Sequence, residues 1–179
     1  YLAKMIKTDK TEHIKSSEPR EGRTVIKPFK KVKHTLASII NNFGIDEDVL
    51  NSFKYPDHGK KLYFVSGDWD DNRTGIYDRI GLKLGSYEKN DQVILNSIAA
   101  QALSQHFTKG IIDLDDPEEL KTYMEGGTVK KYADSSRSSG ADRQVILRSD
   151  GEIIGTGVVT ERGLKSQFPR GHRNQNFRF

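Results

Sequence analysis

The sequence contains no cysteine, only five prolines and a single tryptophan. Without thiols, the chain has no structural disulfide, no thiolate metal ligand and no thiol nucleophile. No apolar run approaches the roughly 18–20 residues that a membrane span requires, and the N-terminal residues lack the apolar segment of a signal peptide. We therefore expect an intracellular or virion protein without a membrane partner, rather than a secreted protein stabilised by disulfides.

Apolar side chains are also scarce. Hydrophobic residues make up 34% of the 179 residues and charged residues 30%, and the charged share exceeds the roughly 25% typical of globular domains. The length fits one domain with extended ends. We predict a single core domain over residues 25–163, an extended basic N-terminal arm over residues 1–24 and a basic, aromatic C-terminal arm over residues 164–179.

The net charge of +4 is unevenly distributed along the chain. Residues 1–33 contain ten basic and four acidic side chains, and residues 161–179 contain five basic and one acidic. The remaining 14 basic and 20 acidic side chains give residues 34–160 a net charge of −6. Two basic ends therefore flank an acidic middle, and such ends are typical of segments that bind a partner.

Apolar spacing and capping residues predict four helices. The stripe of Val32, Leu36 and Phe43 predicts a helix over 30–43, followed by Gly44 at the position that favours glycine. Asp46 is expected to cap a short second helix that Pro56 ends. Apolar residues at helical spacing predict the longest helix over 91–107, and the run 116–119 (Asp-Pro-Glu-Glu) predicts the start of a fourth.

Short apolar runs predict strands over 24–26, 62–65, 128–133 and from about residue 79. The clearest element is a hairpin over 143–160, because Asp150-Gly151 favours a two-residue type I′ turn. This turn would place Leu147 opposite Ile154. Helices and strands do not alternate strictly, so we expect an α+β fold with a mainly antiparallel sheet, about four helices and a C-terminal hairpin.

The densest acidic cluster lies in the loop over residues 68–78. Asp68, Asp70 and Asn72 match the first three ligand positions of a calcium loop, but Arg73 and Arg79 occupy the positions that require glycine and glutamate. A solvated loop is the simpler interpretation, and a divalent-cation site at Asp68 and Asp70 stays open. Trp69 in this loop is a candidate interface residue.

No motif in the sequence specifies a catalytic site. The five histidines lack metal-ligand spacing, the serines lack a nucleophile elbow, and the glycines lack a phosphate-loop ending. We expect no cofactor and no enzymatic activity. One serine-rich loop contains Arg137, which together with backbone amides is a candidate phosphate contact.

The C-terminal segment interleaves aromatic and basic residues. Such side chains bind nucleic acid by stacking and phosphate contact, or anchor an arm on a neighbouring subunit. The candidate partner-binding residues of this arm are Phe168, Arg170, Arg173, Phe177, Arg178 and Phe179.

Three hypotheses follow from these patterns. The leading one is a non-enzymatic structural subunit of a large assembly, such as a viral or phage shell, neck or tail, whose arms dock on copies of itself or on other subunits. The alternative is a nucleic-acid-binding or ribonucleoprotein component whose basic ends contact phosphates. The third is a metal-dependent enzyme that uses the loop 68–78. The N-terminal candidates for nucleic-acid contact are Lys27, Lys30, Lys31 and Lys33.

Overall fold

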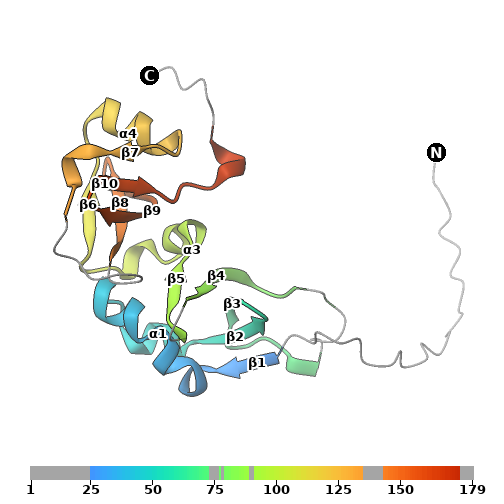
Figure 1. Cartoon of the computed structure of the whole chain (residues 1–179). Helices are drawn as coiled ribbons and strands as arrows, with labels where there is room; N and C mark the ends of the chain where they lie inside the picture. The colour runs from blue at the N-terminus through green and yellow to red at the C-terminus, as the bar shows by residue number, and fades with distance from the viewer. Residues whose placement is uncertain (1–24, 73–76, 78, 89–90, 135–142, 174–179) are drawn as a thin grey trace, which may run out of the picture.

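The structure is a computed structural model that describes residues 25–72, 77, 79–88, 91–134 and 143–173. These residues form four α-helices and two five-stranded, mostly antiparallel sheets, so the predicted α+β class is confirmed. Figure 1 shows the two sheets in separate halves of the molecule, with α3 between them. The predicted arm over 1–24 and the candidates Arg137, Phe177, Arg178 and Phe179 lie outside the described residues.

The first half contains a sheet whose strands are in sequence order, each antiparallel to the next. Each strand therefore pairs with the next strand along the chain, and the connection from β1 to β2, residues 29–52, contains two helices. The five strands are β1 (Val25–Pro28), β2 (Phe53–His58), β3 (Lys61–Ser66), β4 (Leu82–Tyr87) and β5 (Val93–Leu95).

Two predicted helices precede β2. Helix α1 (Phe29–Phe43) ends at Gly44, whose φ of 64° lets its N–H donate to the carbonyl of Ile40 at 2.9 Å. Helix α2 (Glu47–Asn51) is capped as predicted, because the Asp46 carboxylate accepts from the N–H of Asp48 at 2.8 Å. The expectation that Pro56 ends this helix is wrong, since α2 ends at Asn51 and Pro56 lies within β2.

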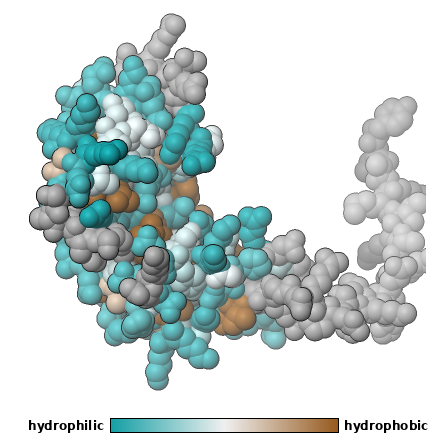
Figure 2. Space-filling model, in the orientation of Figure 1, coloured by the Kyte–Doolittle hydropathy of each residue, from teal (hydrophilic) through white to brown (hydrophobic). Residues whose placement is uncertain are grey.

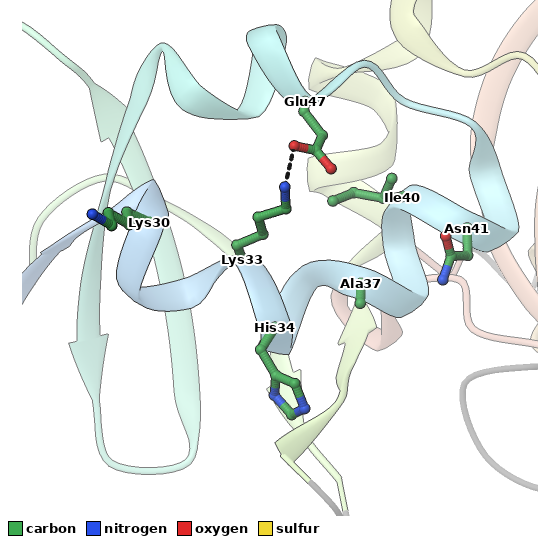
Figure 3. Close-up of a pocket in the computed structure, with 7 residues that line it drawn as sticks. All are labelled: Lys30, Lys33, His34, Ala37, Ile40, Asn41 and Glu47. Atoms are coloured by element: carbon green, nitrogen blue, oxygen red, sulfur yellow. Dashed lines mark ion pairs between the residues drawn. The ribbon is translucent and has the colours of Figure 1, made fainter.

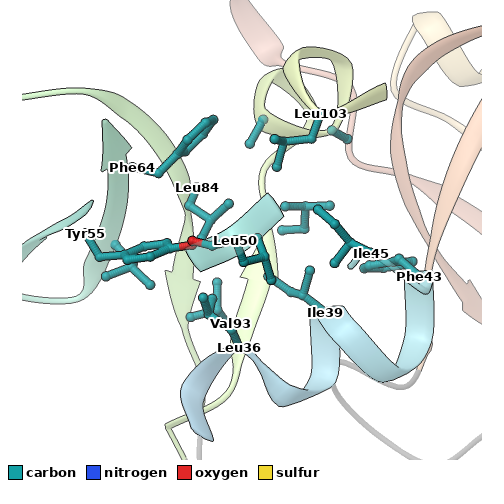
Figure 4. Packing of buried hydrophobic residues seen from close by; sticks show 14 of the residues in the cluster. Leu36, Ile39, Phe43, Ile45, Leu50, Tyr55, Phe64, Leu84, Val93 and Leu103 are labelled. Carbon is teal, nitrogen blue, oxygen red and sulfur yellow. The ribbon is translucent and has the colours of Figure 1, made fainter. Parts of the chain in front are cut away.

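The apolar stripe of α1 packs on the first sheet. Leu36, Ile39 and Phe43 are each at most 1% exposed, and they belong to one buried cluster with side chains from β2, β4 and β5 (Figure 4). Burying side chains of this size contributes roughly 1.5–3 kcal/mol each to the free energy of unfolding. The amphipathic pattern therefore fixes which face of α1 turns towards the sheet.

The predicted helix over 91–107 is wrong in its first part and too long. Val93–Leu95 forms strand β5, α3 covers only Ser97–Ala102, and Ser104–His106 forms a 3₁₀ turn. The side chain of Asn96 caps α3 by accepting from the N–H of Ile98 at 3.0 Å. Pairing of β5 with β4 outweighs the helical spacing of the apolar residues, because an edge strand buries the same side chains.

The second half contains a sheet with the order β6-β8-β9-β10-β7, in which β6 and β8 are parallel and the other neighbours antiparallel. Helix α4 (Pro117–Met124) begins as predicted, with the Asp116 carboxylate accepting from two backbone N–H groups. The strands are β6 (Ile111–Asp113), β7 (Thr128–Val129), β8 (Gln144–Ser149), β9 (Glu152–Thr160) and β10 (Gly163–Ser166).

The predicted hairpin is present as β8 and β9. Asp150 and Gly151 both have positive φ, at 50° and 82°, as a type I′ turn requires. The predicted pairing of Leu147 with Ile154 is wrong, because the register shifts after Leu147 and pairs it with Gly155. Gly155 therefore lies at a bulge, where one strand has an extra residue.

The structure continues the second sheet beyond residue 163, where the sequence predicted the start of an arm. Strand β10 pairs with β9 and β7, and Phe168 after it is 9% exposed. Conversely, the strand predicted over 128–133 is shortened to β7, and Lys130–Tyr132 forms a 3₁₀ turn, η4. Pairing across the sheet rather than local apolar content determines these ends.

A buried polar network joins the two halves. The Ser97 hydroxyl of α3 lies 3.0 Å from the Thr156 hydroxyl of β9 and accepts from the Thr156 N–H at 3.1 Å. The side-chain carbonyl of Gln167 accepts from Thr156 at 3.0 Å and from the Gln144 amide at 2.7 Å. Because every link in this network is neutral, it satisfies buried polar groups without burying a charge.

Candidate functional site

A polar cleft of about 450 Å³ opens on the second sheet. It lies where β7, β10 and the ends of β8 and β9 meet. The residues that line it are Thr128, Arg143, Thr160, Glu161, Arg162 and Lys165.

The register of the sheet places these side chains together. Lys165 of β10 pairs with Thr128 of β7 on one side and with Val158 of β9 on the other. Its neighbours Leu164 and Ser166 are buried while Lys165 is exposed. Successive strand residues point to opposite faces, so Lys165 projects from the core into the cleft.

The turn between β9 and β10 holds the rim of the cleft. The Thr160 hydroxyl donates to the carbonyl of Gly163 at 2.7 Å and accepts from the N–H of Arg162 at 3.2 Å. Gly163 has a φ of 127°, and a side chain there would meet the carbonyl oxygen of Val129 at 2.4 Å. The chain therefore turns tightly enough to bring Arg162 beside Lys165.

The cleft is positively charged. Three of its six lining residues are basic, and Glu161 is the acidic one. Within the described ranges, neither Arg162 nor Lys165 has a carboxylate within salt-bridge distance. Lys130 is exposed in η4, which packs against β10, and adds a further basic side chain at this edge. Such a concave basic surface attracts anions.

The predicted N-terminal contacts lie in the other half of the molecule. Lys27 forms an ion pair with Asp57, and Lys33 forms one with Glu47 at 2.6 Å. Lys30 and Lys31 are exposed on α1. Two of the four candidate lysines are therefore already paired with a carboxylate of the same half.

The C-terminal candidates that the structure describes fold back on their own chain. Phe168 packs edge-on against Tyr123, with ring centroids 5.7 Å apart, within the core of the second half. The Arg173 guanidinium donates to the carbonyl of Phe168 at 3.1 Å, and Arg170 lies in the 3₁₀ turn Arg170–His172. The Phe168 ring is thus part of the hydrophobic core of its own chain.

The acidic loop provides hydrogen bonds within itself. The Asp70 carboxylate accepts from the backbone N–H and the side-chain amide of Asn72, both at 3.0 Å, and Asp68 is exposed. Trp69 contacts Tyr77 edge-on at 6.0 Å between ring centroids. In the part of the chain that the structure describes, no group of three histidine or acidic residues could hold a metal ion.

The sequence did not identify the cleft. In the sequence Arg162 and Lys165 are two of the basic residues over 161–179, and no motif relates them to Thr128, Arg143 or Thr160. Their separation along the chain hides the cluster, which forms only when β7 pairs with β10. The one available signal was the excess of basic residues after residue 160.

Comparison with known protein families and curated sequences finds no relative. No protein family matches the chain, and no curated protein sequence is significantly similar to it. Among the described helices, none combines the length and apolar character needed to span a membrane.

Proposed function

We propose that this chain binds nucleic acid through the basic cleft on its second sheet. The observation that carries the proposal is the convergence of Arg143, Arg162 and Lys165 on one concave surface. Phosphate contacts from lysine and arginine supply most of the affinity of sequence-independent nucleic-acid binding. The Thr128 side chain at the same cleft adds a hydroxyl that suits a phosphate or sugar oxygen.

The size and rim of the cleft favour a single strand. A volume of about 450 Å³ lies within the range of sites for small organic ligands, and so suits a unit of nucleotide size rather than the width of a duplex. The Glu161 carboxylate is a hydrogen-bond acceptor beside the basic donors of the cleft. Such an acceptor suits a base amino group or a ribose hydroxyl. A single strand exposes both groups beside its phosphates.

The test is binding of a fluorescein-labelled single-stranded oligonucleotide to the full chain, measured by anisotropy over a salt series. Each phosphate contact contributes about −0.7 to the slope of log K against log salt for a single strand. Charge reversal of two contacts, Arg162→Glu with Lys165→Glu, is expected to weaken binding and to reduce the slope by about 1.4.

A matched control separates the cleft from the overall charge. Lys60→Glu with Lys61→Glu changes the net charge equally, at the turn between β2 and β3 in the other half. The proposal requires nearly unchanged binding in this control. Equal loss in both double variants, or binding by the wild type that ignores salt, would overturn it.

Self-association within a larger assembly is the second candidate. It is supported by exposed apolar side chains in the first half, with Val25 at 55%, Tyr77 at 50% and Leu82 at 37% exposure. Figure 2 shows hydrophobic residues (brown) at the molecular surface among hydrophilic ones (teal). We propose that such an assembly, a virus or phage particle included, would use exposed apolar side chains of the first half rather than Phe168. Light scattering of the native chain at tens of micromolar tests it, and a monodisperse monomer would refute it.

A further inference from the structure

A second groove, of about 430 Å³, runs along the solvent-facing side of α1 in the first half of the molecule. Six of its seven lining residues lie on α1, and the seventh, Glu47, lies on α2 (Figure 3). The lining residues are Lys30, Lys33, His34, Ala37, Ile40, Asn41 and Glu47.

The groove follows the helix axis. Its α1 residues recur at steps of three, four, seven, ten and eleven from Lys30, which is the spacing of one helical face. From Lys30 to Asn41 the helix rises about 16 Å, the length of three helical turns. This length matches about three turns of another helix.

The chemistry of the groove changes along its length. The N-terminal half contains Lys30, Lys33 and His34, and the floor further along is formed by Ala37 and Ile40 (Figure 3). Ala37 leaves room for close approach of a partner, and Ile40 offers an apolar contact that is already packed on the core below.

The charge at the basic end is not fully compensated. Glu47 neutralises Lys33 at 2.6 Å, while Lys30 is exposed and has no carboxylate within salt-bridge distance among the described residues. The first turn of α1 contains no acidic residue, and Pro28 before it provides no side-chain cap. Negative charge from a partner would therefore meet both Lys30 and the positive end of the helix dipole.

We propose that this groove docks an acidic amphipathic helix of a partner protein. The apolar side of that helix lies on Ala37 and Ile40, and its acidic end lies against Lys30 and His34. Helix-in-groove recognition uses apolar anchors at i, i+3, i+4 and i+7 of the bound helix, and the apolar part of this groove, Ala37 and Ile40, contacts two of them. The apolar floor distinguishes this surface from the polar cleft of the other half, and the proposal does not depend on nucleic-acid binding.

The test uses the full chain and a labelled helical peptide of about 16 residues, with leucines at that spacing and glutamates at one end. An anisotropy titration is expected to show saturable binding of this peptide. The same peptide with lysines in place of the glutamates is expected to bind roughly tenfold more weakly, because attraction to Lys30 becomes repulsion.

Two variants and a matched control locate the site. Lys30→Glu and Ala37→Glu are each expected to weaken binding of the acidic peptide roughly tenfold. Lys31→Glu changes the net charge as Lys30→Glu does, but Lys31 is exposed outside the groove and this variant is expected to bind normally. Circular dichroism checks that α1 is intact in all three.

Several outcomes would overturn the proposal. These are no binding of the acidic peptide, equal binding of the two peptides, or equal loss in Lys30→Glu and Lys31→Glu. If Lys30→Glu instead abolished oligonucleotide binding and left the peptide unaffected, the groove would be a nucleic-acid surface. Failure of the cleft variants in the oligonucleotide assay would leave this inference standing.

Discussion

The side-chain amide of Gln144 pairs with the backbone of Leu95 as another strand would. Its Nε2 donates to the Leu95 carbonyl at 2.8 Å, and its Oε1 accepts from the Leu95 N–H at 2.9 Å. Leu95 lies in β5 at the edge of the first sheet, and Gln144 lies in β8 of the second. The buried Gln144 side chain of the second sheet thus satisfies the backbone hydrogen-bonding groups of Leu95 at the edge of the first sheet.

Replacing this amide is expected to destabilise the whole chain. Gln144→Leu leaves the N–H and carbonyl of Leu95 buried without these partners, which costs about 2–4 kcal/mol in the free energy of unfolding. Urea denaturation followed by circular dichroism measures it. A loss below about 0.5 kcal/mol would show that the pair contributes little.

Gln144→Glu makes the same contact sensitive to pH. A carboxylate accepts from the Leu95 N–H but cannot donate to the Leu95 carbonyl, so the folded state favours the protonated acid and raises the pKa of the new side chain. Since the folded form then binds the proton more tightly than the unfolded form, the stability deficit relative to wild type shrinks as the pH falls. Urea denaturation near pH 5 and pH 7.5 checks this, and a deficit that grew on acidification would contradict it.

Two glycines of the hairpin are expected to tolerate alanine differently. A Cβ on Gly151 meets no atom within 4 Å, so Gly151→Ala costs only the strain of a positive φ, about 1 kcal/mol. A Cβ on Gly155 would lie 2.5 Å from the Tyr123 hydroxyl and 3.1 Å from Ser97. Gly155→Ala is therefore expected to cost about 3 kcal/mol or more, and equal unfolding free energies would refute the bulge geometry.

Phe168 is expected to behave as a core residue. Phe168→Ala removes a ring that packs on Tyr123, and such cavities cost about 3–5 kcal/mol. A melting temperature lowered by several degrees would follow, measured by differential scanning calorimetry. An unchanged melting temperature with loss of self-association would instead restore Phe168 as a docking anchor.

Tyr87 is expected to make the protein less stable in alkali. Burial and the nearby Asp57 carboxylate, which accepts from the Tyr87 hydroxyl at 3.0 Å, raise the pKa of Tyr87 above its ordinary value of 10.0. Above pH 10 the unfolded chain loses this proton while the folded chain retains it, so stability falls as the pH rises. Tyr87→Phe should make that fall less steep in urea denaturation without abolishing it, because burial also raises the pKa values of Tyr55 and Tyr123. An identical slope would contradict the assignment.

Local signals predicted the elements that depend on few residues. Asp46 and Asp116 each accept a hydrogen bond from a backbone N–H at most three residues later, and the Asp150-Gly151 turn depends on the φ angles of those two residues. The structure has all three as predicted. The apolar stripe of α1 was equally clear. Such elements can be inferred without knowing what lies across the fold.

Elements decided by pairing could not be predicted in this way. Val93 and Leu95 fit a helical face as well as a strand, and only β4 decides between them. Strand β10 has one core side chain, Leu164, in a polar segment, so its place between β9 and β7 has no local signal. The cleft depends on that same pairing, so the sequence shows its basic residues only as an excess of positive charge.

The order of the strands along the chain sets the order in which the sheets can form during synthesis. All five strands of the first sheet lie before residue 96, whereas β6 has no partner until β8 has been translated. At about 5–20 residues per second the ribosome adds β8 several seconds after β5. During that interval the Leu95 N–H and carbonyl at the edge of β5 have no Gln144 amide to pair with. A newly made first half therefore exposes a strand edge that the finished protein covers.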